Sequence, residues 1–303
     1  MGNTLKEISV LYAKKQPKQV DYITEEAPVL SQIPWEQASH GLWNAFEEVT
    51  DVTGAGFVKL NDPLPEMDVD SELKKFDLGI MGGQIKCPED KARLFGGKEA
   101  YFAKKLNTVL RKSGQSAEYS ILYNNIRQYA IDNGKALEPD TIEAGNVHFS
   151  ILAIRYVSGE TTGLYSPDGF EQGAMLNAEP INGGNLYDIG SGVLGYGIRL
   201  KGYFGFQIAN PNTVAAIVNV SDGTGSVPTK AQIDDIISMV RGTPGSTFLY
   251  MHERCKNLLS YKGDYLQMTV ADKDINRVFY SWNGIPIVTS YNFLNGTEPV
   301  VTL

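Results

Sequence analysis

The run of glycines between residues 190 and 195 is the clearest candidate for cofactor chemistry in this sequence. Gly190, Gly192 and Gly195 match the GxGxxG pattern of dinucleotide-binding loops. That pattern binds a pyrophosphate only where a strand precedes it and a helix follows, because the helix N-terminus holds the phosphates. Residues 196–202 instead alternate in polarity and contain two further glycines. The motif therefore predicts a β-turn, and a nucleotide-dependent enzyme that uses this loop is a remote alternative.

Three histidines and two cysteines are the only soft side chains available for metal or nucleophilic chemistry. His252 and Cys255 lie three residues apart on a short predicted helix, where they could share a metal or form a nucleophile pair. The remaining members, Cys87, His148 and His40, have no zinc-ligand spacing. No third group is evident to orient a His–Cys pair. We therefore expect a helix-cap or surface histidine and a pair of reduced thiols.

Acidic residues gather between positions 61 and 72. An EF-hand calcium loop would need a glycine at its sixth position and a helix on either side, and neither is present. We therefore expect an exposed, solvated loop containing Asp62, Glu66, Asp68, Asp70 and Glu72. Taken together, these motifs predict no catalytic residues, no cofactor-binding residues and no metal site, and hence a protein that is not an enzyme.

Composition narrows the class of protein further. The chain has 303 residues, of which 42% are apolar and 20% charged, as is ordinary for a globular protein. Its net charge of −8 argues against binding nucleic acid through overall charge, because phosphate contacts need clustered Lys and Arg. No run approaches the length of a membrane span, and the N-terminal residues contain no signal-peptide core. We therefore expect no membrane partner.

The longest helical pattern runs from residue 98 to residue 134. A helix of about 25 residues would measure near 37 Å and act as a spine for the rest of the chain. Gly114 leaves open one long kinked helix or two helices with Ser116 as an N-cap, and Gly134 is a stop signal. The apolar stripes at helical spacing are Phe102, Leu106, Val109 and Leu110, followed by Tyr119, Leu122, Ile126, Tyr129 and Ala130.

Before this helix the pattern favours strands. Residues 46–52 and 56–60 flank a turn at 53–55, which predicts a hairpin followed by the acidic loop. An isolated hairpin is marginal in water, so we expect another chain to cover it. Residues 1–34 resemble an arm with too few apolar residues for its own core, which indicates docking on a neighbouring surface.

After the helix the chain reads as a glycine-rich β region with two helices, which gives an α+β class with mixed connectivity. The expected strands lie at 146–157, 203–210, 213–220, 247–251 and 299–303. Helices are predicted from Thr229 to Gly242 and over 253–261. A hairpin is predicted at 278–290, where Asn283-Gly284 is the dipeptide typical of a type I′ turn.

The order of these parts resembles that of the major capsid proteins of tailed bacteriophages, which have the HK97-like fold. The similarity is to the podovirus-type members, although Ser166 precedes the proline and Gln207 stands where an arginine is usual in their β segment. The similar stretches are 43–49 with 64–65 at the start of the E-loop, 116–125 at the end of the spine helix, 162–169 with 205–210 in that β segment, and 280–288 in the closing strands.

The resemblance implies a division of the chain into four parts. It assigns residues 1–42 to an N-terminal arm and 43–86 to an extended β-hairpin, the E-loop. It assigns residues 87–145 to a P-domain with the spine helix, completed by strands from the later chain. Residues 146–303 form a mixed α/β A-domain, with a β-rich insertion at 160–212 and closing strands at 278–303.

The resemblance also implies a function and partners. The chain would self-assemble through hexamers and pentamers into an icosahedral shell around phage double-stranded DNA, with weak non-specific contact with that DNA. It would bind a portal protein and, since only about 40 residues precede the E-loop, either a separate scaffolding protein or none. A decoration protein outside the shell is a further partner that the resemblance allows. It would assemble in the host cytoplasm and reside in the virion capsid. The alternatives are an encapsulin-type nanocompartment shell and a phage tail or fibre protein, whose expected repeats are absent.

Overall fold

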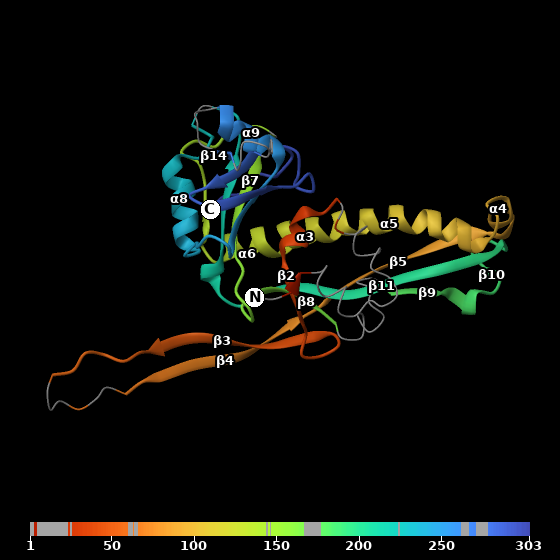
Figure 1. Ribbon diagram of the computed structural model, residues 1–303, viewed down its shortest axis with the longest axis horizontal. Helices are drawn as coiled ribbons and strands as arrows, with labels where there is room; N and C mark the ends of the chain where they lie inside the picture. Colours follow the sequence, from red (N-terminus) through yellow and green to blue (C-terminus); the bar gives the residue numbers. More distant parts are fainter. Residues whose placement is uncertain are drawn as a thin grey trace.

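The computed structural model describes residues 3–4, 24, 26–59, 63, 66–143, 145, 147–166, 177–223, 225–261, 267–270 and 278–303. Within them the molecule is elongated, with a compact α/β unit, a limb of one long helix over strands, and a two-stranded projection on the opposite side (Figure 1). The long helix runs from the compact unit to the far end of the limb. This arrangement confirms the predicted α+β class with a spine.

The spine is one continuous helix. It consists of α5 (Lys98–Ser120), the π-helical segment η1 (Ile121–Arg127) and α6 (Gln128–Asp132), which together are about 50 Å long at 1.5 Å per residue. Of the two alternatives, a single long helix is found and a second helix capped by Ser116 is not, because Gly114 is buried inside α5 and the Ser116 hydroxyl donates to the carbonyl of Lys112. Gly134, at φ +63°, follows the end of the helix as predicted.

The limb is built on β11 (Leu194–Ile208), whose middle and N-terminal part pairs antiparallel with β5 (Gly79–Pro88). The short helix α4 (Glu89–Leu94) connects β5 to the spine at the far end. The other strands of this sheet are β8 (Thr161–Tyr165), β9 (Asn177–Pro180), β10 (Tyr187–Asp188), β2 (Pro34–Gln37) and β1 (Asn3–Thr4), and η2 (Ile181–Gly184) follows β9.

A second sheet forms the compact unit. Its order is β14 (Gln267–Val270), β15 (Val278–Trp282), β16 (Ile285–Thr289), β13 (Thr247–Met251), β7 (Phe149–Arg155), β12 (Val214–Val220) and β6 (Ala136–Leu137). The helices α8 (Lys230–Met239) and α9 (Glu253–Tyr261) and the turn η3 (Pro211–Thr213) complete it. The predicted strand 247–251, the helix 253–261 and the Asn283-Gly284 hairpin, with both residues at positive φ, are confirmed.

The core lies on both faces of β7, which explains its almost continuous apolar run. Leu152 and Ile154 face the cluster that contains the spine helix, whereas Ile151 and Ala153 face the cluster that contains α8. Thr229 begins α8 as predicted, with a capping box completed by Gln232.

The predicted hairpin turn at residues 53–55 is wrong. The strand β3 (Trp43–Thr53) ends where this turn was expected to begin, and its partner is β4 (Asp68–Asp77), with Thr53 opposite Asp68, whereas residues 54–59 form no strand. Part of the predicted acidic loop is therefore strand, although its described side chains are exposed as expected. Acidic residues can occupy this strand because both faces of a two-stranded ribbon are exposed to solvent. The sequence of such a strand therefore lacks the alternation of buried and exposed residues by which other strands are recognised.

The described part of the predicted arm packs on its own chain. The helix α3 (Pro28–Gln32) lies against the spine, and Val29, Leu30 and Ile33 are fully buried in the main core. The expectation of an arm without a core is therefore wrong for these residues. Residues 5–23 of the predicted arm lie outside the described residues.

The predicted closing strand at 299–303 is also absent. The backbone of Val301 is instead hydrogen-bonded on both sides by the Asn219 side chain, which accepts from its N–H at 2.9 Å and donates to its carbonyl at 2.7 Å. Asn219 lies at an irregularity in β12, with φ at +59°. The Asn219 side chain thus makes the backbone hydrogen bonds that a neighbouring strand would make to a strand at 299–303.

Candidate assembly surface

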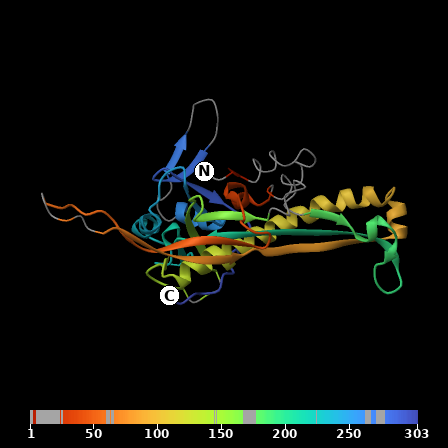
Figure 2. The same ribbon diagram turned by 90° about the horizontal axis from the view of Figure 1, so that it is seen from below.

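The most exposed element of the molecule is the β3–β4 ribbon, which stands clear of the body in both views (Figures 1 and 2). Among the described residues its two strands pair only with each other. Leu73 is 80% exposed and Met67 69%, and Phe57, beyond β3, is completely exposed. Apolar side chains of this size in a ribbon with no core behind it indicate a surface that another molecule covers.

The root of the ribbon is held against the body by specific contacts. The Leu78 N–H donates to the Leu42 carbonyl at 2.8 Å, and the Asn44 amide donates to the buried Gln207 at 2.7 Å. The Phe76 ring lies so close to Gly205 that a Cβ there would come within 2.6 Å of it. Glycine at 205 is therefore required for the ribbon to leave the body at this angle.

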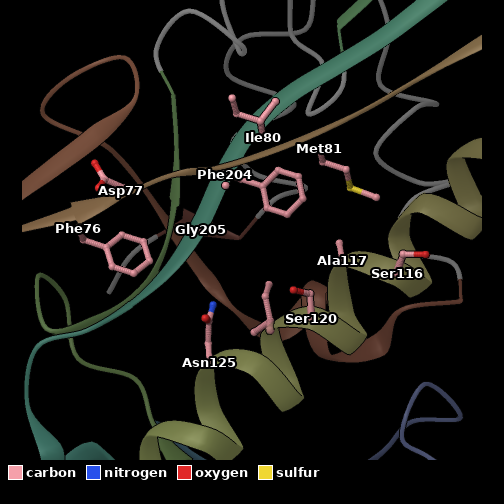
Figure 3. Close-up of a pocket in the computed structure, with 12 residues that line it drawn as sticks. Phe76, Asp77, Ile80, Met81, Ser116, Ala117, Ser120, Asn125, Phe204 and Gly205 are labelled. Carbon is pink, nitrogen blue, oxygen red and sulfur yellow. The ribbon is translucent and has the colours of Figure 1, made fainter.

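A groove runs beside the ribbon root, between the spine helix and β5 (Figure 3). Its volume is about 480 Å³, and a smaller hollow of about 140 Å³ that shares Met81 continues it along β5. The walls are mostly apolar, with the hydroxyls of Ser116 and Ser120 and the amide of Asn125 on the helix side. The lining residues are Phe76, Asp77, Gly79, Ile80, Met81, Ser116, Ala117, Ser120, Ile121, Asn125, Phe204 and Gly205.

The far end of the limb carries a second group of exposed apolar side chains, which we call the far-end patch. Leu94 is 85% exposed and Leu194 54%, with Phe95, Leu186 and Val193 also exposed. β11 and β5 bring them together, because Gly195 pairs with Pro88 directly before α4. The GxGxxG run lies here as the turn between β10 and β11, where the Ile189 N–H donates to the Val193 carbonyl. The β-turn interpretation is confirmed, since the segment that follows is a strand.

Two buried carboxylates hold the elements that position these surfaces, and the sequence analysis missed both. Glu118, on the spine helix, accepts from the backbone N–H groups of Val29 at 2.9 Å and Leu30 at 3.2 Å. It also accepts from the Ser290 hydroxyl and the Asn292 amide. Burial raises the pKa of the Glu118 carboxyl, although these hydrogen bonds oppose the shift. Its position four residues after buried Gly114 and four before buried Leu122 was the available signal.

The second carboxylate, Glu298, ties the C-terminal segment to the spine. It accepts from the Tyr123 hydroxyl at 2.6 Å and from Ser150, and its Oε2 lies 3.5 Å from Arg127 Nε. Burial raises the pKa of Glu298 and, with the adjacent Glu298 charge, that of the Tyr123 hydroxyl. The Glu298 carboxylate and the Tyr123 hydroxyl are therefore both hydrogen-bonded within the fold.

The histidines and cysteines singled out by sequence are not brought together around a common ligand. His252 Nδ1 accepts from the Arg254 N–H at 3.0 Å, which confirms a helix cap at the start of α9. Burial, with the nearby Arg254, lowers the His252 pKa, and burial raises the pKa of the Cys255 and Cys87 thiols. Among the described residues, no group of three or more His, Cys, Asp or Glu could hold a metal ion.

No helix in the described part of the chain is long and apolar enough to cross a membrane.

Neither a comparison with protein families nor one with curated proteins finds a match for this sequence. Solved structures do match. A chain of the near-atomic structure of bacteriophage epsilon15 is 13% identical over 88% of this chain and 87% of its own, with a TM-score of 0.53. The bacteriophage JBD30 capsid is 7% identical over 85% of this chain and 88% of its own, with a TM-score of 0.54. The chain has the HK97-like capsid fold.

The predicted fold class is thus confirmed by structures with which the chain shares little sequence. The holo-SrpI encapsulin complex from Synechococcus elongatus is also similar, at 13% identity over 64% of this chain and 88% of its own, but its TM-score is 0.46. That likeness is weaker and does not bear on the choice between a phage shell and a nanocompartment.

Proposed function

We propose that this protein is the major capsid protein of a tailed bacteriophage, which self-assembles through hexamers and pentamers into an icosahedral shell around double-stranded DNA. The single observation that carries the proposal is the β3–β4 ribbon, an exposed element without a core of its own on an HK97-like fold. Head-to-tail contacts that close on themselves produce rings. A ribbon that reaches a neighbouring copy is a contact of this kind.

The proposal includes the domain assignment and the location. Residues 1–42 are the N-terminal arm, of which the segment around α3 packs on the core of its own chain. Residues 43–86 are the E-loop, 87–145 the P-domain and 146–303 the A-domain. The strands β3 and β4 are the described part of the E-loop that stands clear of the body. The protein is structural and not an enzyme, assembles in the host cytoplasm and ends in the virion capsid.

The proposed partners beyond the chain itself are a portal protein, a separate scaffolding protein and a decoration protein. Contact with packaged DNA is weak and non-specific, which is supported by the net charge of −8, since like charges repel the phosphate backbone.

The test is a shortened ribbon. Glu47 and Leu73 lie opposite each other in the register, so residues 48–72 can be replaced by Asn-Gly, which closes a two-residue hairpin. Because none of the described residues of the removed segment belongs to the core, we expect a soluble variant that retains the helical circular dichroism signal and forms no shells. Wild-type protein, expressed alone and with its neighbouring genes, should give uniform hollow shells or capsomers by negative-stain electron microscopy.

Shells of normal size from the shortened variant would exclude the ribbon as the assembly element. A wild-type protein that remains a small oligomer under every condition, including with its neighbouring genes, would exclude the capsid function itself.

A further inference from the structure

The spine helix carries positive charge on the half that faces solvent. Between Glu99 and Glu118 its sequence contains four basic residues and no acidic one, and Glu118 itself is buried. One of the four, Arg111, already has an interaction within the chain. The other three are exposed and are here called the basic face, namely Lys104, Lys105 and Lys112. A chain with a net charge of −8 thus has a local surface that attracts anions.

The fold leaves the ammonium groups of the basic face without a neutralising partner. Phe102 and Leu110 are buried on the other half of the helix, which turns the lysines outward at 100° per residue. In the described part of the chain, Lys104 Nζ lies 5.8 Å from the centroid of the Phe95 ring, and Lys112 donates to the Gln115 side chain at 3.2 Å. Neither an aromatic ring nor an amide cancels the charge of an ammonium group, so the face remains cationic.

The acidic part of the molecule lies elsewhere. The ribbon sequence, residues 43–77, contains nine acidic and three basic residues, a net charge of −6. The ribbon projects on the opposite side of the compact unit from the limb that carries the spine (Figure 1). An anion that approaches the basic face therefore does not meet the ribbon of the same copy.

The spacing of the basic face suits the phosphate backbone of a nucleic acid duplex. Lys104 and Lys112 are eight residues apart in the helix, which is about 12 Å along its axis. Double-stranded DNA carries one phosphate charge per about 1.7 Å of its length, so about seven phosphates lie within that span. A lysine is a flexible point charge that can contact any phosphate within its reach and reads no base. The face therefore fits binding without sequence preference.

We propose that Lys104, Lys105 and Lys112 contact the phosphate backbone of the double-stranded DNA inside the shell, so that the spine side of the limb faces the interior. The inference rests on the proposed function and names the surface of its weak DNA contact. The contact is weak because the chain as a whole is negatively charged.

The test removes the charge of the basic face in the variant Lys104→Gln/Lys105→Gln/Lys112→Gln. Fluorescence anisotropy measures the affinity of the unassembled full chain for a labelled DNA duplex of random sequence over a range of salt concentrations. Each lost phosphate contact lowers the slope of log affinity against log salt by about 0.9. We expect the slope to become shallower by about 2 to 3 and the affinity at low salt to fall by about tenfold or more. Because these lysines contact DNA and not protein, the variant should still assemble into shells of normal size.

The matched control, Lys59→Gln/Lys86→Gln/Lys201→Gln, removes the same charge from exposed positions elsewhere. Lys86 and Lys201 follow Ile85 and Leu200, which pack in the core on the spine side of the sheet, so by strand alternation they point to the other side. The control should bind the duplex as wild type does, and thermal unfolding of both variants should match that of wild type.

An equal loss of affinity in the control, or an unchanged affinity in the basic-face variant, would overturn the inference. So would a basic-face variant that retains its affinity for DNA but forms no shells, because a protein would then be the partner of these lysines. These outcomes leave the capsid function intact, whereas wild-type protein that never forms particles overturns that function whether or not it binds DNA.

Discussion

At the scale of residues, Glu118 connects three parts of the fold, namely the spine helix, α3 and the segment after β16. No cation among the described residues forms an ion pair with it, and four donors from α3 and from the segment after β16 satisfy it instead. A carboxylate buried in this way costs free energy to desolvate but holds its donors firmly. Its removal would leave backbone N–H groups of α3 buried without acceptors.

The raised pKa of Glu118 predicts a pH dependence of stability. The unfolded carboxyl ionises near its ordinary value of 4.5, whereas the folded one retains its proton to higher pH. In that window the folded state binds more protons, so the free energy of unfolding falls as pH rises. We expect the stability of wild type relative to Glu118→Gln to decrease from pH 4 upward until the folded carboxyl has ionised. Urea unfolding of the shortened-ribbon protein at several pH values measures this, and a flat or rising difference would contradict the shift.

At the scale of elements, α3 is part of the core and not a detachable arm. Val29, Leu30 and Ile33 have no exposed surface, and burial of side chains of this size contributes about 2 kcal/mol each. Deleting residues 1–33 should therefore lower the free energy of unfolding by about 5 kcal/mol or abolish folding. Deleting residues 1–23 keeps α3 and, among the described contacts, removes the pairing of β1 with β2, so it should lower the free energy of unfolding by much less. Equal stability of the two truncations in urea would show that α3 does not stabilise the subunit.

Whether an element could be predicted from the sequence depends on whether neighbouring residues or contacts distant in the chain determine it. The spine, α8, α9 and the Asn283-Gly284 hairpin are marked by local signals, namely helical periodicity, a capping box and a turn dipeptide. The register of β3 with β4 has no such mark, because neither face of the ribbon is buried. The packing of α3 and the replacement of a closing strand by Asn219 depend on contacts between residues far apart in the chain. Such contacts leave little trace in a local pattern.

The candidate surface was predicted in outline only. The exposed acidic hairpin and its need for cover could be expected from composition, since five acids in a short polar stretch cannot form a core. The groove could not, because β5 and the spine that form its walls become neighbours only through the pairing of β5 with β11. The far-end patch likewise depends on a strand pairing that brings α4 beside β11.

At the scale of the whole molecule, exposed apolar surface occurs at both ends of an elongated body, on the ribbon and at the far end of the limb (Figure 1). Contacts through one head-to-tail surface can close a ring, but joining rings into a shell needs a second kind of contact. The far-end patch is placed to provide it, since it lies at the end of the limb opposite the ribbon. Mutations in the ribbon should therefore prevent the formation of rings, whereas mutations at the far end of the limb should prevent the joining of rings into a shell.

The variant Leu94→Glu/Leu194→Glu tests this separation. Both side chains are more than half exposed, so the charges should cost the folded subunit less than about 0.5 kcal/mol. Between copies they would be buried without partners, which opposes contact at the far end. We expect capsomer-sized rings that do not progress to shells, visible by negative-stain microscopy and as a smaller sedimentation coefficient, whereas the shortened ribbon should give no rings at all. Complete shells from the double variant would show that rings are joined through another surface, and a loss of rings would place the far end in the head-to-tail contact itself.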